Sequence, residues 1–111
     1  MTRAKRSIEA AVTIDGLSLI WHLHREQQFS EEEGWRGLAI HVKVADGVRR
    51  ELYLEYPAWV RQTQSIKYTE PSRPNISPAK VEAHIRQAMA AGWDPESRGK
   101  PFVHELNELP N

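Results

Sequence analysis

Hydrophobic and polar residues alternate along the first half of the chain and follow a helical period in the later part. Alternation with a period of two is typical of strands that bury one face, and a period of 3.6 residues is typical of a helix with one apolar side. Strands followed by a helix predict an α+β domain. We expect a basic N-terminal tail over residues 1–7 and a single globular domain over residues 8–111.

The first two predicted strands flank the dipeptide Asp15-Gly16. This pair favours a two-residue turn with positive φ angles, which joins antiparallel strands. Such a turn sets Ile14 opposite Leu17. It also gathers on one face all the alternating apolar residues, which are Ile8, Ala10, Val12, Ile14, Leu17, Leu19, Trp21 and Leu23.

A second hairpin is predicted from two further apolar runs, one with Leu38, Ile40, Val42 and Val44 and the other with Val48, Leu52 and Leu54. A two-residue turn between the runs would mix apolar and charged residues on one face. A three-residue loop over residues 45–47 keeps the faces separate and sets Ile40 opposite Leu52. This loop requires Gly47 in a left-handed conformation.

Two segments outside these hairpins contain polar residues, glycine or proline. Residues 26–37 read as a loop in which Phe29 and Trp35 fold back over the core. For residues 57–74 two alternatives stay open: a short helix over "PAWVRQTQ" and a strand over "SIKYT", followed by a linker.

One helix is predicted over residues 78–91. Ser77 is suited to the N-cap and Pro78 to the first helical position, and Ile76 is placed to contact Val81 across the cap. The apolar stripe of the helix consists of Val81, Ile85, Ala88 and Met89. We expect this stripe to pack on the apolar face of the sheet.

The stretch "AAGWDPESRGKPF" reads first as the end of this helix. Gly92 suits the left-handed residue that ends a helix, and Trp93 stands where a side chain packs back on the last turn. Alternation over residues 102–106 then predicts a last strand. The fold predicted is an antiparallel β-meander of four strands, with residues 102–106 as a candidate fifth, and one C-terminal helix.

The run "RPNISPAKVEAHIRQAMAAGWDPESRGKPF" resembles the C-terminal part of small uncharacterised bacterial proteins of accessory or mobile-cassette type. Those proteins carry a helix followed by the pattern GW[DN]PxSxGKxF, and the resemblance covers about the last third of the chain. The resemblance implies no catalytic residue. It implies that Trp93, Pro95, Gly99 and Phe102 act as a unit.

Composition narrows the classes of function. The chain of 111 residues has 15 basic and 15 acidic side chains, and this balance argues against nucleic acid or a membrane surface as partner. The absence of cysteine removes thiol chemistry and fits a cytoplasmic protein. No apolar segment follows "MTRAKRS", so no signal peptide or membrane span is expected there. Gly-x-Ser-x-Gly and glycine-rich phosphate motifs are also missing.

Three histidines form the candidate metal site. His22 and His24 stand two apart on one strand and project from the face opposite the apolar residues. His41 lies on the equivalent face of the next long strand, and some registers bring it beside them. With Glu9 or Glu51, three imidazoles would satisfy a zinc ion. The alternative is an ordinary water-facing surface, where histidine is common.

Basic residues in the last third form a candidate anion site. Arg98 and Lys100 follow Trp93 in the chain, and Arg73 precedes the helix. Together they are a candidate anion-binding or nucleic-acid-binding set. The competing interpretation is that Trp93, Arg98 and Lys100 belong only to the helix end and the turn that follows it.

The polar face of the sheet also carries Ala11, Ile20, Ala39 and Tyr53, a mixture typical of a modest protein interface. Tyr53 and the loop residue Trp35 are the expected anchors, because aromatic side chains dominate interface energetics. The sequence therefore favours a non-enzymatic binding module that contacts a protein partner or self-associates as a homodimer. No cofactor is expected. A metal protein or metal-dependent enzyme on the histidine face is the alternative.

Overall fold

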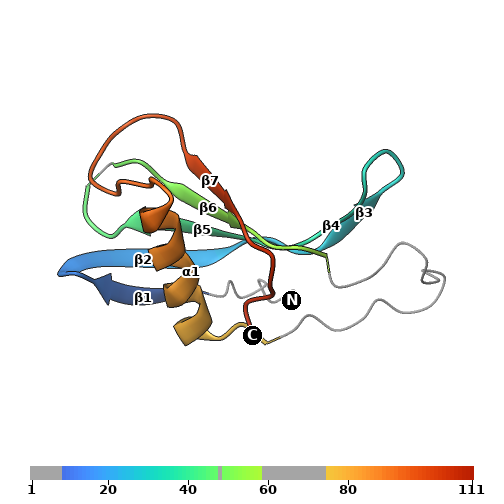
Figure 1. The fold of residues 1–111 in the computed structure, drawn as a ribbon, viewed down its shortest axis with the longest axis horizontal. Coiled ribbons are helices and arrows are strands. Elements are labelled where there is room, and N and C mark those ends of the chain that lie inside the picture. Colours follow the sequence, from blue (N-terminus) through green and yellow to red (C-terminus); the bar gives the residue numbers. More distant parts are fainter. Residues whose placement is uncertain (1–8, 48, 59–74) are drawn as a thin grey trace, which may run out of the picture.

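The structure is a computed structural model and describes residues 9–47, 49–58 and 75–111. Seven strands and one helix lie within these residues (Figure 1). They are β1 (Glu9–Ile14), β2 (Leu17–Arg25), β3 (Gln28–Ser30), β4 (Gly34–Arg36), β5 (Ala39–Val44), β6 (Leu52–Glu55), α1 (Pro78–Ala90) and β7 (Phe102–Glu105). The domain is of the α+β class, as predicted.

Five strands form the main sheet in the order β1-β2-β5-β6-β7. The first four are antiparallel neighbours, whereas β7 runs parallel to β6. The candidate fifth strand is therefore confirmed, but the sheet is mixed and not a pure antiparallel meander. In the sequence, α1 stands between β6 and β7. A connection through a helix allows the chain to enter β7 in the same direction as β6, as parallel neighbours require.

The first hairpin has the predicted register. Ile14 pairs with Leu17, and the pairing continues to Glu9 opposite His22. Asp15 and Gly16 both have positive φ angles, of 53° and 81°. The turn dipeptide and the apolar alternation therefore agree, and together they determine this register.

The second hairpin differs from its predicted register by two residues. Ile40 pairs with Leu54 instead of Leu52, although Gly47 has the expected positive φ of 89°. The backbone N–H of Arg50 donates to Ser97 (2.8 Å), so the chain before β6 is bonded to a distant loop and not to β5. A shift of two preserves the face of every side chain, and the apolar pattern therefore tolerates it. Val48, predicted opposite Val44, lies outside the described residues.

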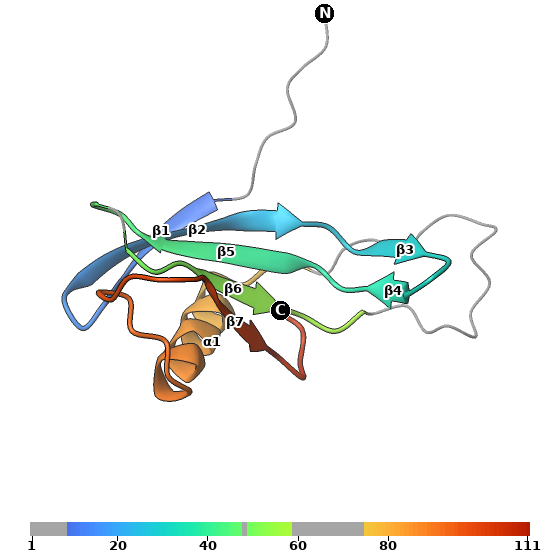
Figure 2. The same cartoon turned by 90° about the horizontal axis from the view of Figure 1, so that it is seen from above.

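Residues 26–37 do not fold back over the core, and this prediction was wrong. Strands β3 and β4 pair as a hairpin arm that extends away from the main sheet (Figures 1 and 2). Phe29 pairs with Trp35 across the arm, with ring centroids 5.3 Å apart, and Phe29 is 45% exposed. Cross-strand aromatic contact thus stabilises the arm itself.

Helix α1 begins and ends where the capping residues indicate. The Ser77 side chain accepts a hydrogen bond from the Lys80 N–H (3.4 Å). At the other end Gly92 has a φ of 126°, and the N–H of Trp93 donates to the Ala88 carbonyl (2.9 Å). This bond and that from Gly92 to Met89 form a Schellman motif. The helix end predicted at "AAGWDP" is confirmed.

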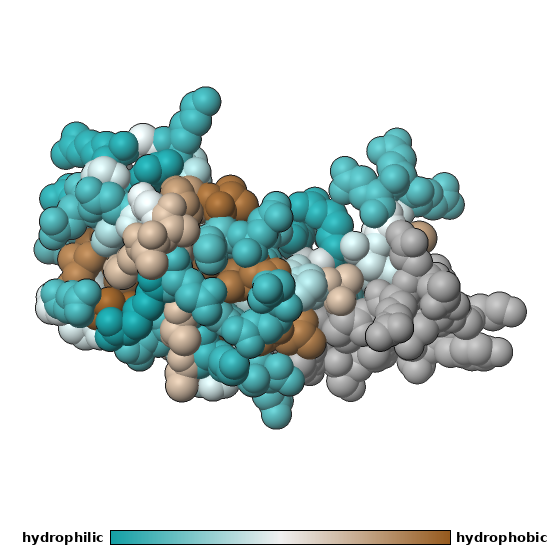
Figure 3. Space-filling view, viewed as in Figure 1, coloured by the Kyte–Doolittle hydropathy of each residue, from teal (hydrophilic) through white to brown (hydrophobic). Residues whose placement is uncertain are grey.

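One hydrophobic cluster joins the sheet to the helix. Its fully buried members include Leu19, Ile40 and Leu54 from the sheet and Val81 and Ile85 from α1. Figure 2 shows α1 on one side of the sheet, and Figure 3 shows hydrophobic residues as small patches among hydrophilic ones. The opposite side of the sheet has no helix among the described residues.

No helix in the described part of the chain is long and apolar enough to cross a membrane. The alternatives for residues 57–74 concern a segment of which only Pro57 and Ala58 are described.

Candidate binding surface

The side of the sheet away from α1 presents one row of side chains that crosses all five strands. The pairings set Glu9 beside His22, His22 beside His41, His41 beside Tyr53 and Tyr53 beside Val103. We call this side of the sheet the open face. Besides the row, it comprises Ala11, Ile20, His24, Ala39, Lys43, Glu55 and Glu105.

The three predicted histidines meet on the open face. The rings of His22 and His41 are 4.9 Å apart between centroids, and those of His24 and His41 are 6.3 Å apart. Tyr53 contacts both His24 and His41 at 4.9 Å. His24 reaches this group although β2 has a bulge between Leu23 and Arg25. The expectation that His41 lies beside the other two is therefore confirmed.

His41 is the buried member of the group. It is 8% exposed, and neither of its ring nitrogens makes a hydrogen bond. Nε2 lies 3.1 Å from Oε1 of Glu51, close enough for electrostatic attraction but without hydrogen-bond alignment. Tyr53 is opposite His41 in the register, whereas the predicted Ile40–Leu52 register would set Glu51 there, and that pairing was wrong. Glu51 nevertheless reaches His41, although it stands two residues before Tyr53 and just ahead of β6.

Desolvation lowers the pKa of His22 below its usual 6.5, and positive charge on His41 or His24 would lower it further. Glu9, its neighbour on β1, acts in the opposite direction. The imidazole of His22 is therefore neutral at pH 7 and keeps a lone pair available.

Within the described part of the chain, no three histidine or acidic side chains stand ready in a metal-ligand arrangement. The prediction that His22, His24 and His41 bind a metal consequently depends on side-chain rotation.

The apolar part of the open face is smaller than the sequence indicated. Ala39 is fully buried, because the ion pair between Arg25 and Glu55 (2.6 Å) lies in the same cross-strand row and covers it. Arg25 also donates to the Gly37 carbonyl (3.0 Å). Accessible apolar surface remains at Val103, which is 55% exposed, and at the partly exposed Ile20 and Tyr53.

Trp35 does not belong to the open face. Its ring packs on Phe29 in the arm and lines a hollow of about 320 Å³ together with Arg25, Glu55 and Tyr56. The two aromatic anchors expected from the sequence, Tyr53 and Trp35, therefore lie on separate surfaces.

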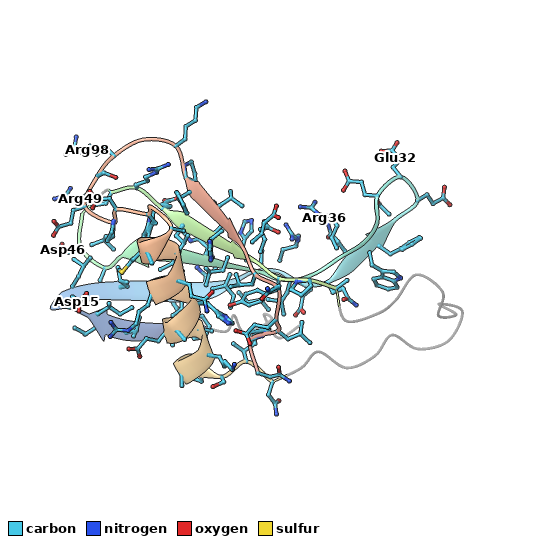
Figure 4. All side chains as sticks on the ribbon, in the orientation of Figure 1. Asp15, Glu32, Arg36, Asp46, Arg49 and Arg98 are labelled. Atoms are coloured by element: carbon cyan, nitrogen blue, oxygen red, sulfur yellow. The ribbon has the colours of Figure 1, made fainter. Side chains whose placement is uncertain are left out.

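Trp93 is 2% exposed, and its indole Nε1–H donates to the Arg50 carbonyl (3.1 Å). Arg50 in turn donates from Nε to the Lys100 carbonyl (2.8 Å). Arg98 and Lys100 are exposed, and Figure 4 shows Arg98 at the end of the molecule opposite Glu32 of the arm. Trp93 thus fixes the loop from inside the core. Arg73 lies outside the described residues.

A hydrogen-bonded network on the helix side was missed. His84 of α1 is fully buried, with Nδ1 2.9 Å from the Tyr56 hydroxyl and Nε2 3.0 Å from Oε2 of Glu108. Lys80 donates to the other oxygen of Glu108 (3.1 Å). His84 follows Val81 by three positions, so it extends the apolar stripe, and this was a usable signal. Nothing in the sequence indicated Glu108.

Two ring nitrogens of His84 link the groups of this network. A carboxylate only accepts, so Nε2 of His84 donates to Glu108, and Nδ1 shares a hydrogen bond with the Tyr56 hydroxyl. Burial, assisted by the charge of Glu108, raises the pKa of Tyr56 well above 10. Hydrogen bonds from His84 and Lys80 lower the pKa of Glu108. With the Ser77 N–H donating to the Pro110 carbonyl (2.7 Å), these bonds fasten the C-terminal segment to α1.

No protein-family model, curated protein or solved structure has a significant match to the chain. The resemblance of its last third to small bacterial accessory proteins accordingly stays a prediction.

Proposed function

We propose that this chain is a small non-enzymatic binding module that associates with a second copy of itself through the open face. One observation carries the proposal. A five-stranded sheet has α1 on one side, and the other side presents partly exposed apolar and aromatic groups. Antiparallel sheets often leave one polar face in water, and Ile20, Tyr53 and Val103 are apolar or aromatic exceptions on this one.

The composition of the open face supports a protein partner. Tyr53, Ile20 and Val103 supply apolar contact area at positions spread over three strands, with the histidine rings between them. A mixture of aromatic, aliphatic and polar groups is characteristic of non-obligate interfaces. Tyrosine in particular contributes a large contact area at a low cost in side-chain entropy.

The charges of the open face favour a second copy as the partner. Glu9 and Glu105 lie on the two edge strands, and Lys43 lies on the central strand β5. A two-fold axis can set Lys43 of one copy near an acidic edge of the other, so the charges of the open face are compatible with self-association.

The network at His84 favours a non-enzymatic role. It joins a hydroxyl, an imidazole and a carboxylate, which is the set of groups found in hydrolytic triads. Here, however, the hydroxyl belongs to the buried Tyr56, whose raised pKa keeps it protonated. A protonated hydroxyl with no access to substrate is a structural group.

Sedimentation equilibrium tests the proposal with Val103→Asp, which should fold because Val103 is 55% exposed. The wild type should form a dimer at high protein concentration, and the variant should shift the equilibrium to monomer by at least tenfold in Kd. The matched control is Ala83→Asp on the exposed side of α1, which should dimerise as the wild type does. A wild type that stays monomeric at millimolar concentration, or equal effects of both variants, overturns self-association through the open face.

We also propose a cytoplasmic location, from the absence of cysteine, and a bacterial accessory origin, from the pattern GW[DN]PxSxGKxF. Anion binding by Arg98 and Lys100 would appear as salt-dependent association with heparin or short DNA.

A further inference from the structure

We propose that His22, His24 and His41 form a binding site for a divalent transition-metal ion of the kind that prefers imidazole, with Zn²⁺ as the first candidate. This inference goes beyond self-association, because it concerns a small ion at the centre of the open face. It rests on the placement of the three rings and on the unmet hydrogen-bonding capacity of His41.

The backbone delivers three imidazoles to one spot. His22 and His24 are two residues apart on β2, and His41 is directly opposite His22 on β5. His41 is the shared neighbour, with its ring centroid 4.9 Å from that of His22 and 6.3 Å from that of His24, and rotation of the rings is needed for their nitrogens to meet at one centre. Three imidazoles with an open fourth position are an established ligand set for zinc.

The second observation is the state of His41. Burial of a polar group without a hydrogen bond is unfavourable, so such groups call for an explanation. Both ring nitrogens of His41 are buried without a hydrogen-bond partner. A metal ion on one nitrogen would replace the missing bond, and the nearby Glu51 carboxylate would offset the charge of the ion.

The adjustment that a metal requires falls on His22 and His24. His24 is exposed and His22 is half-buried, and no hydrogen bond among the described residues holds either ring. Their χ angles can therefore change to bring nitrogens to the roughly 2.0–2.1 Å that zinc requires. His41, which is packed against Tyr53, stays in place and defines the centre.

The choice of metal follows from the ligands. Imidazole suits Zn²⁺, Cu²⁺ and Ni²⁺, whereas Mg²⁺ and Ca²⁺ prefer oxygen. Binding should therefore be observed with Zn²⁺ and not with Mg²⁺. Co²⁺ provides a spectroscopic probe, because its visible absorption distinguishes a tetrahedral site from an octahedral one.

The test is calorimetric titration of the untagged full chain with ZnCl₂, together with Co²⁺ absorption spectra. The expected result is one ion per chain, with Kd weakened at least about tenfold in His24→Ala, since even outer-shell changes cost 10–100-fold. His22→Ala should act in the same way. The matched control is His104→Ala on β7, outside the group, which should bind as the wild type does.

Three outcomes overturn the proposal. The first is that the wild type gives neither binding heat nor a visible Co²⁺ band. The others are that zinc still binds the double variant His22→Ala/His24→Ala, or that His104→Ala loses as much zinc affinity as His24→Ala. Thermal melts in chelator verify that the variants are folded. Sedimentation of the zinc-free protein separates this result from self-association, so failure of one proposal does not count against the other.

Discussion

The imidazole of His22 lies edge to face with that of His41, across two neighbouring strands, at a centroid distance of 4.9 Å. This contact puts a buried ring with no hydrogen bond next to an accessible neutral one. It is the central feature of the open face, because Tyr53 and His24 pack around the same ring of His41. A core selected for stability alone would place an apolar side chain at position 41.

Replacement of His41 by leucine should therefore not destabilise the metal-free protein. Substitution of an unsatisfied buried polar group by an apolar one of similar volume is neutral or stabilising, here by up to about 1–3 kcal/mol. Urea unfolding in the presence of chelator measures the difference. A loss of more than 1 kcal/mol would mean that the ring makes favourable interactions that its geometry does not reveal.

Protonation of Glu108 should contribute to acid unfolding. Its pKa in the folded state is lowered from the usual 4.5, so its contribution to stability is present above pH 4.5 and is lost as the pH falls through the folded value. Glu108→Gln should make the free energy of unfolding less dependent on pH below 4.5. Chemical unfolding at a series of pH values measures this. The control Glu105→Gln removes a carboxylate outside the His84 network, and a change in its profile as large as that of Glu108→Gln would contradict the assignment to Glu108.

Ionisation of Tyr56 should limit stability at high pH. Its pKa is raised in the folded state, so its contribution is complete below pH 10 and decreases as the pH rises above 10, where the unfolded chain releases the proton first. Tyr56→Phe should reduce this alkaline loss. The same slope in both proteins above pH 10 would show that Tyr56 is not the group responsible.

Gly37 cannot be replaced without displacement of backbone. A Cβ at this position would lie 2.0 Å from the Tyr56 carbonyl oxygen and 2.6 Å from Pro57. Gly37→Ala should therefore destabilise the protein by several kcal/mol, at the upper end of point substitutions. Arg36→Ala, one residue away on the exposed arm, should change stability by less than about 1 kcal/mol. Similar melting temperatures for the two variants would contradict this account of the close approach.

Loss of the Ser77 cap should be a smaller effect. The Ser77 hydroxyl accepts from Lys80 N–H at 3.4 Å, and the Ser77 N–H is held independently by Pro110. Ser77→Ala should cost about 1 kcal/mol in unfolding free energy. Circular dichroism during urea unfolding checks this value, with the exposed strand residue Ser18→Ala as control. An unchanged midpoint for Ser77→Ala would mean that the long hydrogen bond contributes nothing.

Local signals were sufficient for much of the fold. Asp15-Gly16 and the apolar alternation determined one register, and Ser77, Pro78 and Gly92 marked the helix ends. These features depend on neighbours in sequence, so a pattern can reveal them. The histidine cluster was predicted as the outcome of some registers between two adjacent strands, and the structure has one of these registers, with His22 opposite His41.

Long-range bonds explain what the sequence did not reveal. The Arg50 N–H bonds to Ser97, forty-seven positions away, next to a β5–β6 register that differs by two residues from the predicted one. Glu108 meets His84 only because the C-terminal segment crosses α1. The burial of Ala39 likewise depends on Arg25 and Glu55 from the strands on either side. No periodicity encodes such contacts, since each joins elements whose relative placement must already be known.

Methyl NMR spectra of dilute and concentrated protein test the central claim, that the open face is the contact surface, most directly. The account predicts concentration-dependent shifts for Ile20 and Val103, which lie on that face, and unchanged signals for the buried Ile14 and Ile85. The buried methyls serve as the internal control. Signals of Ile20 and Val103 that stay fixed over the whole concentration range would contradict the account.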